Sequence, residues 1–98
     1  MAKKYNKIVD EKFIIPTEKG GGIIKFEAWE YKDKIVKYNM AYINKNIFSG
    51  DNGRVIGYDN AHNYHHKHYF GEIIEIDDFI SYYDLVLRFK KEVKEFIW

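Results

Sequence analysis

The chain has 98 residues, of which 46% are hydrophobic, 18% aromatic and 32% charged, and its formal net charge is +1. A single proline and the many Ile, Tyr and Phe residues exclude collagen-like and disordered chains, and the length suits one domain spanning residues 1–98. The absence of cysteine excludes disulfides, zinc–thiolate sites and thiol nucleophiles.

No segment has the features of a signal peptide or a membrane span. The basic start, from Met1 to Lys7, is followed by charged residues rather than by an apolar run. The longest central uncharged run, residues 38–44, is far shorter than the roughly 20 residues that cross a bilayer. We therefore expect a cytoplasmic protein without membrane contact. Its positive charge lies in residues 1–71, which a phosphate-rich partner would prefer.

The first three quarters of the chain have the alternation of strands. Residues 5–15 are a short mixed segment that ends before Pro16, a residue confined to strand ends and edges. Turns are indicated at residues 18–22, 32–34 and 50–53, where glycine or polar residues cluster. The pattern between these turns predicts strands over residues 23–31, 35–43, 54–59 and 64–74.

The C-terminal segment changes to a helical period. Ser81 and Asp84 have the spacing of a capping box, which marks the start of a helix. An apolar stripe then follows with spacings of 3, 1, 3, 4, 3 and 1, through Tyr82, Leu85, Val86, Phe89, Val93, Phe96 and Ile97. Strands followed by a terminal helix predict an α+β fold, in which an antiparallel sheet of about four strands packs against that helix.

All four histidines lie within seven residues, from His62 to His68. If this segment is extended, His66 and His68 point to one face, whereas His65 and Lys67 point to the other. His62 lies across the preceding bend and is able to join either face. Asp59, at the end of the preceding predicted strand, is placed to orient an imidazole by accepting its ring N–H.

Three uses of this cluster remain open on spacing alone. Two histidines titrating near neutral pH suit acid–base cleavage of a phosphodiester, with Lys67 or Arg54 stabilising the developing charge. A His-x-His pair with Asp59 or a third histidine also suits a metal ion. The remaining interpretation is a set of surface imidazoles that only hydrogen-bond a loop.

The run from Arg54 to Ala61, Arg-Val-Ile-Gly-Tyr-Asp-Asn-Ala, followed by His-His-Lys-His at residues 65–68, resembles the signature of the TumE family of small toxins. The order of elements resembles that family over about residues 23–97, and the likeness is sharpest over residues 54–68. The resemblance implies a type II toxin–antitoxin system, with a helix-turn-helix antitoxin that binds the toxin directly, and ribonuclease action. The matching positions are Tyr58, Asp59, Asn60, His65, His66, Lys67 and His68.

The leading interpretation is a toxin that cleaves RNA without a metal or other cofactor. His66 and His68 are the predicted acid–base pair, Asp59 orients one of them, and His65 is the reserve for either role. The predicted substrate contacts are Lys67, Arg54, Tyr58 and Asn60. The alternative is a non-catalytic module that binds nucleic acid or a protein, in which the cluster is a metal or contact site. The expected partners are RNA and the antitoxin, and a homodimer is left open.

Overall fold

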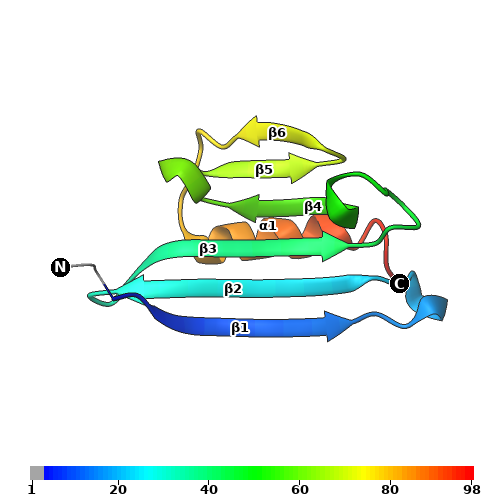
Figure 1. Cartoon of the computed structure of the whole chain (residues 1–98), viewed down its shortest axis with the longest axis horizontal. Coiled ribbons are helices and arrows are strands. Elements are labelled where there is room, and N and C mark those ends of the chain that lie inside the picture. The colour runs from blue at the N-terminus through cyan, green and yellow to red at the C-terminus, as the bar shows by residue number, and fades with distance from the viewer. Residues whose placement is uncertain (1–3) are drawn as a thin grey trace.

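Six strands follow one another across one antiparallel sheet in the computed structural model, which describes residues 4–98 (Figure 1). They are β1 (Asn6–Ile14), β2 (Ile23–Tyr31), β3 (Lys34–Ile43), β4 (Arg54–Asp59), β5 (His66–Tyr69) and β6 (Glu72–Glu75). Each strand pairs only with its neighbours in chain order. The α+β class with an antiparallel sheet is confirmed, but within the described residues the number of strands is six rather than about four.

The two additional strands lie at or beside the edges of the sheet. β1 pairs with β2 along its whole length, but eight of its nine residues are exposed, so its sequence lacks a clear apolar alternation. The predicted strand over residues 64–74 is divided by a two-residue turn at Phe70 and Gly71. Both residues have positive φ, of 48° and 85°, as in the turns that join tight hairpins.

The predicted terminal helix is α1 (Tyr82–Val93). The Ser81 Oγ accepts the N–H of Asp84 at 3.0 Å, which confirms the N-cap half of the expected capping box. Figure 1 shows α1 lying across one face of the sheet, where it contacts β3 and β4. Tyr82, Leu85, Phe89 and Val93 are its buried residues. Phe96 and Ile97 follow the end of the helix but still pack against the core.

The sheet therefore has a helix face, against which α1 packs, and an open face on the other side. The helix face holds the core, because side chains such as Phe26, Met40 and Tyr58 cluster there with Phe89 of α1. Because α1 does not pack against the open face, polar side chains can lie there. No helix within residues 4–98 has the length and apolar character needed to cross a membrane. Residues 1–3, the start of the basic N-terminal segment, lie outside the described residues.

Candidate functional site

β5 distributes its side chains between the two faces of the sheet. His66 and His68 point to the open face, where both contact Asp59 of β4. Lys67 points to the helix face and forms an ion pair with Glu92 of α1. His65, just before the strand, is also on the helix side, where its ring stacks on Phe79. The alternation predicted for an extended segment is therefore present.

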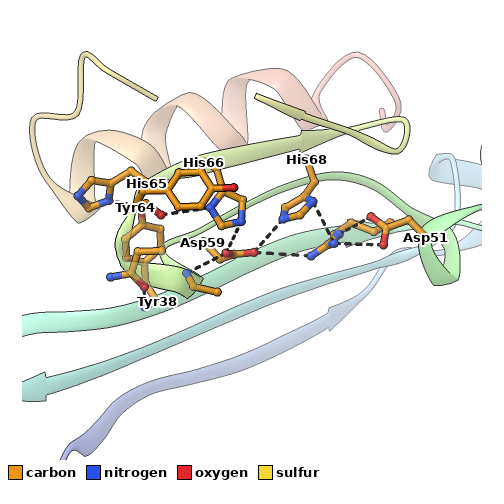
Figure 2. Close-up of polar contacts among 10 residues, drawn as sticks. Tyr38, Asp51, Asp59, Tyr64, His65, His66 and His68 are labelled. Atoms are coloured by element: carbon orange, nitrogen blue, oxygen red, sulfur yellow. Dashed lines mark hydrogen bonds and ion pairs between the residues drawn. The ribbon is translucent and has the colours of Figure 1, made fainter. Parts of the chain in front are cut away.

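Asp59 lies between the two open-face histidines and contacts each with a different carboxylate oxygen. Its Oδ1 is 2.7 Å from His66 Nε2, and its Oδ2 is 3.0 Å from His68 Nε2. Figure 2 shows both imidazoles turned toward this one carboxylate. The arrangement follows from sheet register, because Asp59 is directly opposite His66, and Gly57 is opposite His68.

Arg54, the first residue of β4, extends the hydrogen-bonded group. Its guanidinium donates to both oxygens of Asp51, at 2.8 and 3.1 Å. Its Nη2 lies 3.1 Å from His68 Nδ1, and its Nη1 lies 3.7 Å from Asp59 Oδ2. We call Asp51, Arg54, Asp59, His66 and His68 the Asp59 cluster.

Gly57 provides the space in which the Arg54 side chain lies. A Cβ at this position would be 2.9 Å from Arg54 Cδ and 3.0 Å from the carbonyl oxygen of Met40. Any larger residue would therefore push the arginine side chain away from β4. The glycine lets the guanidinium reach Asp59 and His68 across the surface of the sheet.

The centre of the cluster is largely withdrawn from solvent. The exposed fractions of His66, His68 and Asp59 are 4%, 8% and 9%. Tyr64 contributes to this burial, because its ring stacks on His66 with the two ring centres 4.5 Å apart. Charged groups at such depth depend on their partners, and each of these side chains has at least one.

The hydrogen bonds give the two imidazoles different roles. His66 faces an acceptor with each ring nitrogen, because Nδ1 lies 3.1 Å from the carbonyl oxygen of Tyr64 and Nε2 faces Asp59. Both contacts are hydrogen bonds when the ring carries two protons. His68 instead accepts from Arg54 at Nδ1 and donates to Asp59 at Nε2, as a neutral ring does.

The surroundings of His68 also lower its pKa. Burial is the largest cause, and the nearby Arg54 guanidinium acts in the same direction. The Asp59 carboxylate opposes both, but the pKa remains below the ordinary histidine value. A neutral His68 beside a cationic Arg54 is therefore the favoured state at neutral pH.

The structure does not bring the other predicted site residues to this cluster. Tyr58 and Lys67 both contact Glu92 on the helix face, and burial raises the pKa of the Tyr58 hydroxyl. His65 hydrogen-bonds the Tyr38 hydroxyl at 2.7 Å, and burial lowers its pKa. Asn60 donates to the carbonyl of Val36 at 2.9 Å and so ties the end of β4 to β3.

Two members of the surroundings were not identified as site residues from sequence. Asp51 falls in a predicted turn, three residues before Arg54, and this spacing permits an ion pair within the turn. Tyr64 lies two residues before His66, which places both on one side of an extended chain. The sequence left the face of His62 open. In the structure, His62 is exposed in a short 3₁₀ turn between β4 and β5.

The centre of the Asp59 cluster also has the donor atoms of a metal site. One ligand atom from each of Asp59, His66 and His68 lies within 4.8 Å of the others. A carboxylate with two imidazoles is a donor set that zinc accepts. The Arg54 guanidinium, however, contacts both Asp59 and His68, and its positive charge would oppose a divalent cation there.

Comparison with known proteins gives a family for this arrangement. Searches of the curated proteins and of the solved structures each found no match. The family model described as Toxin TumE matches residues 9–97, which include every strand from β2 to β6, the Asp59 cluster and α1. Because the match covers nearly the whole chain, the protein belongs to the TumE family of toxins.

Proposed function

We propose that this toxin stops growth by cleaving RNA at the Asp59 cluster without a metal ion. The observation that supports this most directly is the contact of His66 and His68 with one carboxylate, beside a guanidinium, on the sheet face opposite α1. Acid–base cleavage of a phosphodiester needs these groups: a proton acceptor, a proton donor and a cation for the phosphorane. Acting on cellular RNA, the toxin works in the cytoplasm.

In the proposed reaction, His68 is the base and His66 is the acid. The phosphate draws the Arg54 guanidinium toward itself, which frees His68 Nδ1 to take the proton of the 2′-hydroxyl. The 2′-oxygen then forms a bond to phosphorus as the bond to the 5′-oxygen breaks. His66 donates its Nδ1 proton, released from the carbonyl of Tyr64, to that 5′-oxygen. The products are a 2′,3′-cyclic phosphate and a free 5′-hydroxyl. Asp59 holds both imidazoles in place throughout.

The geometry also supports a smaller set of proposed substrate contacts. Arg54 is the proposed phosphate contact, because its guanidinium lies beside His68, where it also contacts the carboxylates of Asp51 and Asp59. Lys67 is paired with Glu92 on the helix face, and Tyr58 shares that partner, so neither is proposed for this phosphate. His65 and Asn60 are proposed to support the structure around the cluster rather than the reaction.

The toxin family implies an antitoxin as partner, and we propose the helix-turn-helix type. A second candidate function is a metal-dependent reaction or binding site at the same residues, which the mutual proximity of their ligand atoms favours. The two candidates differ in their response to a chelator. A homodimer stays a prediction.

The proposal is tested by inducing the toxin alone in bacteria and by assaying the purified protein on RNA. His66→Ala and His68→Ala should each relieve growth arrest and lower cleavage by about 10²- to 10⁴-fold, since loss of an acid or base has that effect. His62→Asn is the matched control, because it removes the exposed histidine of the same segment and should leave toxicity unchanged.

Two results would contradict the proposal. If folded His66→Ala were as toxic as the wild type, His66 would have no part in the reaction. Activity that is lost in EDTA and restored by zinc, with stoichiometric metal in the purified protein, would favour the metal-dependent candidate. Activity that persists in EDTA, with products ending in 2′,3′-cyclic phosphate, is the expected outcome.

A further inference from the structure

We propose that the open face of β2 and β3 binds single-stranded RNA on its way into the Asp59 cluster, with one base stacked on Trp29 and the adjacent phosphate held by Lys37. This inference rests on the proposed ribonuclease function and adds a substrate subsite to it. Three observations carry it: the position of Trp29, a depression that joins it to Asp59, and the distribution of charge.

Trp29 lies on the open face and is not part of the core. Its neighbour Ala28 is fully buried on the helix face, so the alternation of β2 turns the indole to the other side. The ammonium of Lys37 lies 4.6 Å from the ring centre, and that of Lys7 lies 5.1 Å from it. The indole is half-buried, and it becomes a stacking surface for a base when a phosphate draws the Lys37 ammonium away from the ring.

A shallow depression of about 340 Å³ connects this indole to the Asp59 cluster. Trp29, Lys37, Asn39 and Asp59 are among its lining residues. In the sheet register, Trp29 is opposite Lys37, whereas Asn39 is opposite Asp59. Two strand spacings and one same-face step separate Trp29 from Asp59, which is roughly 12 Å. A short single strand that stacks on Trp29 is therefore able to place a phosphate at the cluster.

The charges on this face favour a polyanion. Lys7, Lys12, Lys25 and Lys37 share the open face of β1 to β3 with only two acids, Asp10 and Glu27. Glu27 is held by the Lys7 ammonium at 2.8 Å, and this hydrogen bond lowers the pKa of Glu27. The exposed Lys37 lines the depression and pairs with no acid within residues 4–98, so it is available to a phosphate there.

The ligand expected here is single-stranded RNA rather than a duplex or a protein. An open sheet face with a half-buried aromatic ring lets unpaired bases lie against it, whereas bases inside a duplex are already stacked on one another. The two lysine ammonium groups near the Trp29 ring are unlike the apolar centre of a protein interface.

The test measures binding of a fluorescein-labelled, 2′-O-methylated RNA oligonucleotide, which has no 2′-hydroxyl to react. Trp29→Ala should raise the Kd by about 5- to 100-fold, the usual effect of removing a stacking partner, and Trp29→Phe should restore most of the affinity. Lys37→Ala should make the log–log salt dependence shallower by about 0.7. Trp98→Phe and Lys34→Ala, which change the second tryptophan and another exposed lysine of β3, are the matched controls.

The Trp98→Phe protein also reports directly on the subsite, because its remaining tryptophan fluorescence should be quenched when the oligonucleotide binds. This measurement decides the proposal even if Trp29→Ala does not fold. Unchanged fluorescence with bound oligonucleotide, or wild-type affinity in folded Trp29→Ala, would overturn the subsite. If the wild type cleaves RNA in either case, the proposed reaction at the Asp59 cluster still holds.

The two proposals fail in different ways. Oligonucleotide binding that depends on Trp29, without cleavage of unmodified RNA, would overturn the ribonuclease and support the subsite. Preferential binding of a duplex would overturn the single-strand assignment. A wild-type protein that neither binds nor cleaves RNA would overturn both.

Discussion

Arg54 is the residue on which the geometry of the Asp59 cluster depends most. Its guanidinium bridges Asp51, Asp59 and His68 from one planar group, which a lysine ammonium cannot reproduce. We predict that Arg54→Lys lowers RNA cleavage by about 10²-fold, the effect of losing one stabilising donor, while the protein stays folded. Single-turnover cleavage and circular dichroism are the measurements.

Arg88→Lys is the matched control for this change. Arg88 also bridges two acids, Asp78 and Asp84, but it lies on α1 and away from the open face. Cleavage by Arg88→Lys should equal that of the wild type. Equal activity in Arg54→Lys would show that the guanidinium has no part in the reaction.

The arrangement of these residues is predictable from the sequence where it depends on strand alternation and a short connection, and not where it depends on a distant element. The pairing of His66 and His68, and the proximity of Asp59, follow from strand alternation and a short connection. Lys67 is correctly predicted to point to the other face, but its predicted role as a phosphate contact does not anticipate the ion pair with Glu92. That partner lies 25 residues away, on an element whose docking the local pattern does not specify.

Among the elements, α1 has a start that the sequence defines well. The Ser81 hydroxyl satisfies the N–H of Asp84, one of the donors that a helix start leaves unpaired. Ser81→Ala should lower the free energy of unfolding by about 1 kcal/mol, the usual cost of losing such a cap. Urea denaturation measures the change, with Ser49→Ala, a serine in the connection before β4, as the control.

This substitution separates stability from activity. The cap lies on the helix side of the sheet, so RNA cleavage by the folded Ser81→Ala protein should match that of the wild type. A large loss of cleavage without a loss of stability would mean that the start of α1 acts on the Asp59 cluster.

The strands show why some elements were predictable and others were not. β2 and β3 are long, each is buried on its helix face, and their predicted bounds differ from the observed bounds by at most one residue. β1 is exposed along nearly its whole length, and β6 is exposed at all four residues, so neither needs an apolar alternation. β1 and β6 are strands because they pair with β2 and β5, and the local sequence of each contains little information about that pairing.

At the scale of the whole molecule, the shifted pKa values predict that stability falls in two stages as the solution is acidified. Burial lowers the pKa of both His65 and His68, so below about pH 6.5 the unfolded chain binds more protons than the folded one. The lowered pKa of Glu27 adds a second loss below about pH 4.5, where that carboxyl begins to protonate in the unfolded chain.

Urea denaturation between pH 7.5 and pH 3.5 checks this order. His65→Phe should reduce the loss between pH 7.5 and 5.5, because the ring that resists protonation is gone. Glu27→Gln should reduce only the loss at lower pH. If the free energy of unfolding fell equally with pH in His65→Phe and in the wild type, His65 would be excluded as a cause of the loss.

The Asp59 cluster is divided between two parts of the sheet that differ in resistance to local unfolding. Asp59 and Arg54 belong to β4, which α1 covers, whereas the two histidines belong to the four-residue β5 beside the exposed β6. A short hairpin at the edge of a sheet opens at a lower free energy than the body of the domain. Two contacts hold this hairpin to the rest of the fold. Lys67 forms an ion pair with Glu92, and the N–H of Phe70 donates to the carbonyl of Val55. The assembled cluster therefore has the lifetime of this edge hairpin rather than that of the whole fold.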